Sequence, residues 1–215
     1  HASAINKRLE TEFTLITEDL ASLSESLLQY RDFTLNILKA LDKNESTVNR
    51  ELMNVSLAET LNVGRPPSRS STYIQLVSTG DIALLQNEKL RILLVKYDQS
   101  IEKNRLLYGE ILAHHLRNGK MLNGVKVERT VESLLEHPEF GKIVDFDFDH
   151  LQQFKGVFTW NHIMHYQNWR AAKAHLVIAE QILEILRSSK RFSISITSLI
   201  AKFNKQYCSF FNIAC

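Results

Sequence analysis

The sequence predicts an all-α protein, built as an elongated up-and-down bundle of three long helices and several short ones. Three observations lead to this fold class. Glycine and proline are scarce, at 7 and 3 of 215 residues, which disfavours a β-sandwich with many tight turns. Apolar residues recur at helical spacing over long stretches. Hydrophobic residues make up 44% of the chain, enough for the core of a single domain over 1–215.

The first long helix is expected from Ile5 to Leu41. Its apolar residues follow steps of three and four along one side, as in a helix that buries one stripe. At a rise of 1.5 Å per residue this helix would extend on the order of 55 Å, hence the prediction of an elongated domain. A second helical stretch is expected over 45–61, before a loop that contains Gly64, Pro66 and Pro67.

Residues 70–91, SSTYIQLVSTGDIALLQNEKLR, predict a compact corner between helices. Thr72 and Gln75 have the spacing of a capping box, and Gly80 suits the left-handed position that ends a helix. Asn87 is expected to cap the next long helix. The residues assigned to this structural corner are Thr72, Tyr73, Gln75, Ser78, Gly80 and Asp81. Its helix-start N–H groups are an alternative ligand site, but capping alone accounts for these residues.

Two more long helices are expected in the second half of the chain. One begins near residue 88 and is stopped by Asn118 and Gly119. A less regular section follows, with a short helix over 130–137. The last long helix is expected over 157–188, with an apolar face wide enough to contact two neighbours. The tail from Arg191 predicts an amphipathic helix, so 190–215 form a peripheral C-terminal helix in this interpretation.

The segment STYIQLVSTGDIALLQNEKLRILLVKY, residues 71–97, resembles the signature of a family of uncharacterised bacterial single-pass membrane proteins with a periplasmic helical domain. The matching positions are Thr72, Tyr73, Leu76, Ser78, Gly80, Asp81, Leu84, Leu90, Arg91 and Tyr97. Outside this segment the resemblance is general, by helix order and length. It implies a periplasmic domain held at the inner membrane by an N-terminal anchor that this chain lacks. The chain also lacks the Trp-Asn-containing stretch that follows the anchor. The family supplies no catalytic residues.

Charge and cysteine content exclude some function classes. The chain has 26 basic and 24 acidic residues and a net charge of +2, and the basic residues are spread out, so nucleic acid is not expected as a partner. Cys208 and Cys215 lie close together and cannot supply a disulfide framework or, by themselves, a four-ligand zinc site. The sequence contains no run of about 18 or more apolar residues that would span a membrane.

Polar residues that interrupt the apolar stripes are the candidate binding residues. The ligand site is predicted at Asn104, His115, Trp160, His162, His165 and Trp169. The aromatic side chains would line a pocket for an apolar or cationic ligand. The alternative is that these side chains simply pack in the interior of the bundle. If they converge in an open cavity, ligand binding is favoured, and if they are packed shut, a scaffold is favoured.

No metal site or cofactor is predicted. His162 and His165 lie three residues apart, and imidazoles at that spacing can reach one metal ion, but no Glu-x-x-His or His-Glu-x-x-His motif accompanies them. In DFDFDH (145–150) the aspartates alternate as at the start of a calcium loop, but the central glycine and terminal glutamate are missing. The alternating phenylalanines instead predict an extended segment with one apolar face.

These observations favour a non-enzymatic extracytoplasmic domain that senses a small ligand or binds a protein partner. Homodimerisation through the long helices is a further expectation, because wide apolar faces must be covered. No catalytic residues are assigned, since the chain lacks a Gly-x-Ser-x-Gly elbow and a phosphate-binding glycine loop. The alternative function is a metal-dependent hydrolase that uses the bundle histidines with Glu110 or Glu180.

Overall fold

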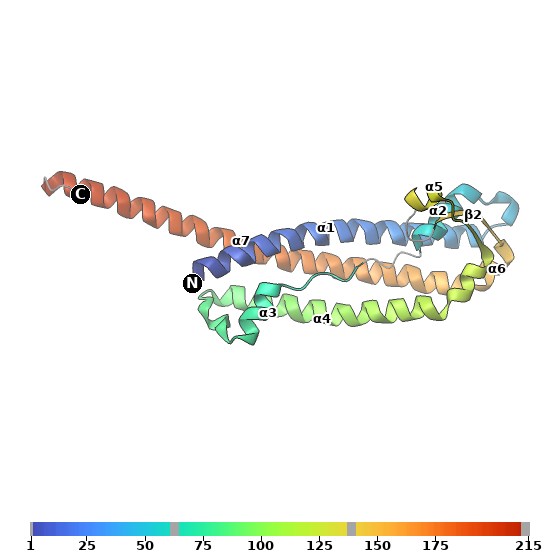
Figure 1. Ribbon diagram of the computed structural model, residues 1–215, viewed down its shortest axis with the longest axis horizontal. Helices are drawn as coiled ribbons and strands as arrows, with labels where there is room; N and C mark the ends of the chain where they lie inside the picture. Colours follow the sequence, from blue (N-terminus) through green and yellow to red (C-terminus); the bar gives the residue numbers. More distant parts are fainter. Residues whose placement is uncertain (1, 61–64, 137–140, 212–215) are drawn as a thin grey trace. The chain divides into compact units, whose positions relative to one another are not determined.

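The computed structural model describes residues 2–60, 65–136 and 141–211, with side chains described for 2–60, 65–133 and 141–188. It is about 82% helical with a small two-stranded sheet (Figure 1), which confirms the prediction of a mostly α-helical protein. The chain forms two compact units. Unit 1 comprises His1–Thr17, Arg69–Asp98 and Val177–Cys215, and unit 2 comprises Glu18–Ser68 and Gln99–Leu176.

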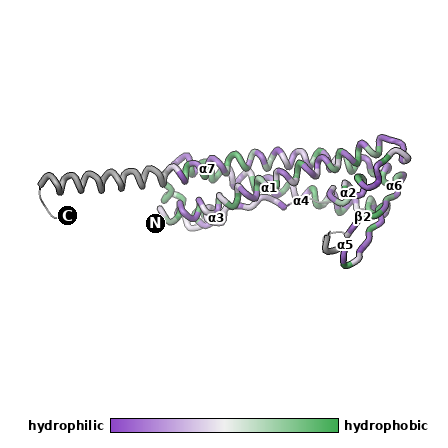
Figure 2. Tube along the Cα trace, turned by 90° about the horizontal axis from the view of Figure 1, so that it is seen from above, coloured by the Kyte–Doolittle hydropathy of each residue, from purple (hydrophilic) through white to green (hydrophobic). Residues whose placement is uncertain are grey.

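Three long helices supply residues to both units, and Figure 2 shows hydrophobic and hydrophilic residues alternating along each of them. In chain order the elements are α1 (Ala2–Leu41), η1 (Glu45–Thr47), α2 (Arg50–Thr60), α3 (Ser71–Ser78), η2 (Asp81–Leu84), α4 (Glu88–Arg117), η3 (Gly119–Gly124), β1 (Val125–Glu128), α5 (Val131–Glu136), β2 (Lys142–Phe146), α6 (Phe148–Gln153) and α7 (Lys155–Phe211). The described part of the expected C-terminal helix belongs to α7. Gly64 and Cys215 lie outside the described residues, and so does the side chain of Cys208.

Unit 1 has a core of large apolar side chains from α1, α3, α4 and α7. Phe13 and Tyr97 are 0% and 1% exposed, and their rings meet edge to face with centroids 5.2 Å apart. Leu9, Leu76 and Ile182 are buried in the same unit, at 0%, 5% and 0% exposed. Because these residues come from four helices, their burial holds the corner segment against α1, α4 and α7.

The corner between α3 and α4 is confirmed, but its predicted capping box is wrong. Ser70 is the N-cap of α3, and its Oγ accepts a hydrogen bond from the Tyr73 N–H at 3.1 Å. Thr72 lies inside the helix and is buried. Gln75 does not reach back to the helix start, and its backbone carbonyl accepts from the Ser78 hydroxyl at 2.9 Å. The helix therefore begins earlier than the Thr-x-x-Gln pattern suggested.

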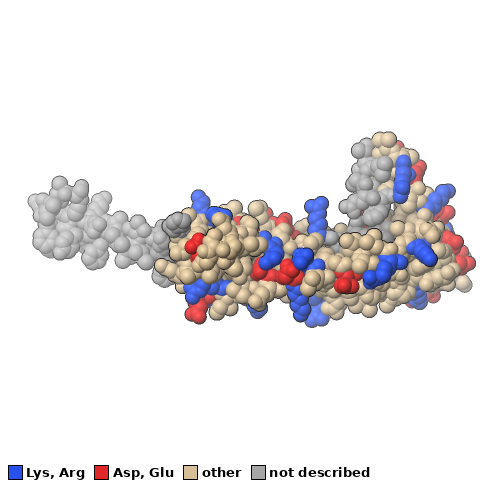
Figure 3. Space-filling view, turned by 60° about the horizontal axis from the view of Figure 1, so that its bottom comes forward, with Lys and Arg blue, Asp and Glu red and all other residues tan. Residues whose placement is uncertain are grey.

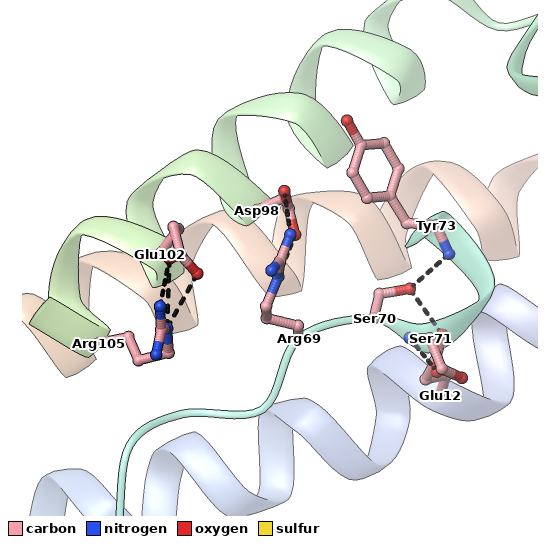
Figure 4. Close-up of polar contacts among 8 residues, drawn as sticks. All are labelled: Glu12, Arg69, Ser70, Ser71, Tyr73, Asp98, Glu102 and Arg105. Carbon is pink, nitrogen blue, oxygen red and sulfur yellow. Dashed lines mark hydrogen bonds and ion pairs between the residues drawn. The ribbon is translucent and has the colours of Figure 1, made fainter. Parts of the chain in front are cut away.

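A carboxylate from α1 completes the cap (Figure 4). Glu12 accepts hydrogen bonds from the Ser70 hydroxyl at 2.6 Å and from the Ser71 N–H at 2.7 Å. The Ser71 hydroxyl and the Thr72 N–H also donate to it, at 2.5 and 3.2 Å. A carboxylate at a helix N-terminus is favourable because it satisfies free N–H groups and complements the helix dipole. Glu12 thereby ties α3 to α1.

Two further predictions for the corner are confirmed, namely the left-handed conformation of Gly80 and the capping of the next long helix by Asn87. Gly80 has φ 77°, in the left-handed region, where a residue without Cβ is least strained. Asp81 accepts from the Thr79 hydroxyl at 2.8 Å. The side chain of Asn87 accepts from the Leu90 N–H at 3.0 Å at the start of α4. These signals act within a few residues of one another, so the sequence alone predicts them.

Two arginines form further side-chain contacts at the corner, Arg69 with α4 and Arg8 with α3. Arg69 forms a bidentate pair with Asp98, with distances of 2.8 and 2.9 Å (Figure 4). Arg8 of α1 donates to the side chain of Gln75 at 2.9 Å. Burial raises the pKa of Tyr73, and the charge of Asp98 acts in the same direction. The corner is thus linked to α1 and α4 by side chains, as well as by its apolar core.

Replacing Glu12 with alanine is expected to destabilise unit 1 by about 1–2 kcal/mol, because Ser71 and Thr72 lose their acceptor in a partly exposed site. Burial alone would raise the pKa of Glu12, but the hydrogen bonds from Ser70, Ser71 and Thr72 together lower it below 4.5. The contribution of the carboxylate is therefore present above pH 4.5 and lost as the pH falls through the lowered pKa. Urea unfolding of the wild type and of Glu12→Ala at pH 7 and pH 3.5 measures how much stability the carboxylate contributes at each pH.

The matched control for this prediction is Glu18→Ala on the same helix, since the Glu18 side chain is exposed. It should change the free energy of unfolding by less than about 0.5 kcal/mol. Equal effects of the Glu12 and Glu18 substitutions at pH 7 would contradict the role of Glu12.

Unit 2 contains the two-stranded sheet and a second apolar cluster. β1 and β2 are antiparallel, with a register shift between Lys126 and Val127. The cluster gathers Ile37, Leu41, Met53, Leu57, Met121, Ile143, Phe146, Phe148, Leu151 and Phe158. It brings α1, α2, η3, β2, α6 and the start of α7 together.

The predicted extended segment 145–150 is only partly confirmed. β2 ends at Phe146, and Asp147 is the N-cap of α6, where its carboxylate accepts from the His150 N–H at 2.9 Å. Asp145 instead accepts from Arg50 at 2.6 Å, and the pair lowers the pKa of Asp145. The two aspartates therefore act as a cap and an ion-pair partner.

Candidate functional site

All six residues of the predicted ligand site lie in unit 2. Asn104 and His115 belong to α4, and Trp160, His162, His165 and Trp169 belong to α7. Asn104 and His165 are buried, at 6% and 2% exposed, and the other four are half-buried. Two of the six residues are thus inside the unit and four reach its surface.

The structure brings three of the predicted histidines together. The charges of His115 and His162 both act on His165, so α4 and α7 present their imidazoles to the same region. The ring centroid of Tyr30 from α1 lies 5.8 Å from that of His165. Nδ1 of His162 is 3.2 Å from the carbonyl oxygen of Arg31. Side chains from α1, α4 and α7 therefore meet around His165.

The two tryptophans do not come together. The ring of Trp160 stacks on His114 of α4, with centroids 3.7 Å apart, whereas Trp169 stacks on Tyr166 at 5.7 Å. Positions 160 and 169 are separated by about two and a half helical turns, so their side chains lie on opposite sides of α7. A pocket lined by both rings is not formed by this arrangement.

α7 runs antiparallel to α4 within unit 2. His175 near one end hydrogen bonds to the backbone of Ser100, and Trp160 near the other end contacts His114. Tyr108 and Asn168 lie between these two contacts along their helices. Both are buried, at 6% and 1% exposed, so polar side chains occupy the middle of this helix pair.

We call five buried polar side chains the polar seam: Asn104, Tyr108, Asn161, His165 and Asn168. Each has at least one buried polar atom without a hydrogen-bond partner, namely Asn104 Nδ2, Tyr108 Oη, both polar atoms of the Asn161 amide, His165 Nε2 and Asn168 Oδ1. Asn161 is 1% exposed. A buried polar group without a partner costs about 1–3 kcal/mol. The polar seam therefore lowers the stability of unit 2 relative to an apolar row at the same positions.

Sequence reasoning missed Asn161, Asn168 and His175, and it placed Tyr108 in the helix stripe but not among the candidate binding residues. On α7 the buried row is Phe158, Asn161, His165, Asn168, Ala172 and His175, with alternating steps of three and four. The sequence predicts a row that also contains Phe158, His165 and Ala172, but it passes through His162 and Trp169 instead of Asn161 and Asn168. The strict alternation of steps, followed regardless of polarity, is the signal that finds this row.

Burial sets the protonation of the histidines. Burial, followed by the charges of His115 and His162, lowers the pKa of His165 to about 4, against a smaller opposing effect of the hydrogen bond to the Thr60 backbone. Burial also lowers the pKa of His175, opposed by its hydrogen bond to the Ser100 backbone. Burial and then the charges of His115 and Arg117 lower the pKa of His114. These imidazoles are neutral at pH 7.

A metal ion is not supported by the described residues. Among the described side chains, those of 2–60, 65–133 and 141–188, no group of three or more histidine, cysteine, aspartate or glutamate residues is arranged to hold one. Glu110 and Glu180, the carboxylates considered for a hydrolase, are both exposed. Glu110 and Glu180 are therefore not buried with His165, which is 2% exposed.

Two open pockets border α2. The larger, about 320 Å³, lies between α2 and β2 and is lined by residues that include Glu51, Val55, Glu59 and Lys142. The smaller, about 140 Å³, lies between α1 and α2. Neither pocket is lined by a residue of the predicted ligand site or of the polar seam.

The N-terminus of α3 does not offer a ligand site either, because Glu12 accepts from the N–H groups of Ser71 and Thr72.

No family model, curated protein or solved structure matches the chain. Among the described residues, no helix combines the length and the apolar character needed to cross a membrane.

Proposed function

We propose that the chain is a non-enzymatic extracytoplasmic domain of a membrane-anchored bacterial protein, and that unit 2 binds a protein partner through the outward side of α4. The observation that carries the proposal is a group of exposed leucines on that side. Leu106, Leu112 and Leu116 are 64%, 53% and 74% exposed. Apolar side chains exposed to this degree on one helix favour an interaction surface.

The leucines belong to a continuous apolar stripe, which we call the α4 face: Leu106, Gly109, Leu112, Ala113 and Leu116. At 100° per residue these positions fall within roughly one third of the helix circumference. Gly109 and Ala113 keep the middle of the stripe low, so that the backbone of a partner can approach closely. No heavy atom lies within 4 Å of a Cβ built on Gly109. Such a stripe suits an amphipathic helix of a partner.

Charged residues border the α4 face. Arg105 and Glu102 form an ion pair at 2.8 Å at the N-terminal end of the stripe, and Glu110 and Arg117 are exposed along one side of it. An apolar centre with a charged rim is the usual composition of a protein interface. Basic and acidic side chains are also interspersed over the surface that Figure 3 shows, which supports a protein rather than a nucleic acid as the partner.

The cellular location in this proposal rests on the resemblance of residues 71–97 to the family of single-pass membrane proteins. We propose that the long helices form an up-and-down bundle at the periplasmic face of the inner membrane. Protease treatment of spheroplasts that express the full-length gene product tests this. Degradation of the domain in intact spheroplasts is expected, and protection until the membrane is opened would contradict the location.

Photo-crosslinking at the α4 face tests partner binding. With a photoreactive amino acid at position 112 or 116, the protein in its native host is expected to give a discrete crosslinked species. The substitution Leu116→Lys, combined with the photoreactive residue at 112, should reduce that species about tenfold, because it places a charge within the apolar stripe. The control site is Leu15 in unit 1, which is 58% exposed. Equal crosslinking at 15 and 116 would contradict the proposal.

A second copy of the chain is one partner to be distinguished. Light scattering of the purified protein decides between a monomer and a dimer. If a dimer forms and Leu116→Lys dissociates it, the α4 face serves homodimerisation. If the protein stays monomeric while the crosslinked species persists in the host, the partner is a different protein.

A small ligand remains the second candidate function, favoured by the unpaired polar atoms of the polar seam. Native mass spectrometry of the gently desalted protein should then show a bound mass that Asn161→Leu removes. Absence of any additional mass in protein taken directly from its host would speak against this candidate.

A further inference from the structure

The histidines of the described chain are concentrated in one unit. The described histidines are His114, His115, His150, His162, His165 and His175, and all of them belong to unit 2. Histidine is the side chain whose charge changes between pH 5 and 8. Among the described residues, the histidines on which a mild change of pH acts therefore lie in unit 2.

His165 is the most enclosed of these histidines, at 2% exposed. The groups around it come from four helices. His162 lies on α7 itself and His115 on α4, and the charges of both act on His165. Tyr30 of α1 places its ring 5.8 Å away, and the backbone of Thr60 in α2 hydrogen bonds to the imidazole. Nε2 has no partner.

We propose that the polar seam of unit 2 is an acid-operated switch. Protonation of His165 separates α7 from α1, α2 and α4 around this residue and lets water reach the seam. This inference goes beyond partner binding and concerns the inward side of α4, whereas the α4 face is outward. Either proposal can hold without the other.

The packing of His165 suits a neutral ring and opposes a charged one. An imidazolium has two N–H donors, but Nε2 lies where no acceptor reaches it. The neighbouring imidazoles of His115 and His162 add repulsion when they are also protonated. Opening relieves both costs, because water accepts from the freed N–H and screens the charges.

The asparagines of the seam lower the cost of opening. Asn161 and Asn168 are each 1% exposed and have polar atoms without partners. Water that enters the seam gives those atoms the hydrogen bonds that the closed packing withholds. An apolar seam would lose burial on opening and gain nothing in return. The polar row on α7 is therefore what makes a reversible opening accessible at this position.

The direction of the pH effect follows from the histidine pKa. The closed state holds the pKa of His165 at about 4, below its ordinary value of 6.5. The open state therefore binds more protons, so acidification through the interval from 6.5 to 4 favours it. For these two values, the ratio of open to closed molecules should rise about 30-fold between pH 7.5 and pH 5. The lowered pKa values of His114 and His175 act in the same direction.

Hydrogen exchange of the whole chain at pH 7.5 and pH 5.0, corrected for the intrinsic pH dependence of exchange, tests the switch. Protection of residues 99–117 and 155–176, in unit 2, is expected to fall about tenfold or more at pH 5.0. Residues 88–98 and 177–188 lie on the same two helices in unit 1, without histidine, and should keep their protection. Unchanged protection in unit 2, or an equal fall in both units, would overturn the proposal.

Two variants distinguish the effect of protonating His165 from the effect of the polar asparagines. His165→Gln keeps a hydrogen-bonding side chain without a titrating ring, so the fall in protection at pH 5.0 should shrink severalfold. Asn161→Leu, one turn away, should raise protection at both pH values and leave their ratio unchanged. If His165→Gln behaves like the wild type, the switch does not depend on His165 and the proposal fails.

A direct titration keeps the proposal testable if either variant folds poorly. The imidazole of His165 in the wild-type protein, followed by NMR between pH 7.5 and pH 4.5, should stay neutral until the unit 2 amides lose protection. A simple titration of His165 near 6.5 with the amides still protected would show that the seam tolerates the charge, and would overturn the switch.

Discussion

Replacing Phe13 with alanine is expected to lower the free energy of unfolding by about 3–5 kcal/mol, the range for large aromatic side chains removed from a packed core. Phe13 is 0% exposed and its ring meets Tyr97 edge to face, with centroids 5.2 Å apart. The substitution removes this contact and leaves a cavity in the core of unit 1. Urea unfolding followed by circular dichroism measures the loss.

The control for Phe13 is its near neighbour Leu15, which is 58% exposed on the same helix. Leu15→Ala should change stability by less than about 1 kcal/mol, since little apolar area is lost and alanine favours the helix. A Phe13→Ala effect below that of Leu15→Ala would mean that the unit 1 core is not packed as described.

Replacing Gly141 with alanine is expected to destabilise unit 2 by about 2–4 kcal/mol. Gly141 has φ 79°, and a left-handed conformation costs a residue with a Cβ about 1–2 kcal/mol. In addition, the new Cβ would lie 2.6 Å from the carbonyl oxygen of Glu128, which is backbone of β1 and cannot move without disturbing the strand pair. Thermal or urea unfolding measures the effect.

Gly156→Ala at the start of α7 is the matched control. A Cβ at Gly156 meets no heavy atom within 4 Å, and alanine is the better helix former. Its effect should be under about 1 kcal/mol and in the stabilising direction. If Gly141→Ala proved as harmless as Gly156→Ala, the described approach of Gly141 to β1 would be wrong.

The helical class and the local stops were predictable from the sequence. Gly80 and Asn87 act on residues within a turn of themselves, so their chemistry is readable from neighbours in the chain. The start of α3 was not predictable in the same way. Its second cap, Glu12, is separated from Ser70 by 58 positions, and no local pattern marks a carboxylate that acts at such a distance.

The candidate site was half predictable. Asn104, His115, His162 and His165 were found because they interrupt apolar stripes, and three of them do meet around His165. Asn161 and Asn168 were missed because an apolar pattern gives no reason to place an amide in a buried row, yet they are among the most buried residues of α7. A pattern of apolar residues alone does not identify the buried side of a helix whose buried row is partly polar.

By itself, the sequence determined that this protein is mostly helical, where several helices stop, and which residue types are available for a site. Those properties depend on interactions within three or four residues. The tertiary structure alone decided that a carboxylate caps α3, that a short strand pair forms in unit 2, and that the amides of α7 face inward. These features depend on which distant segments pack together, because burial is a property of the neighbours a residue acquires and not of the residue itself.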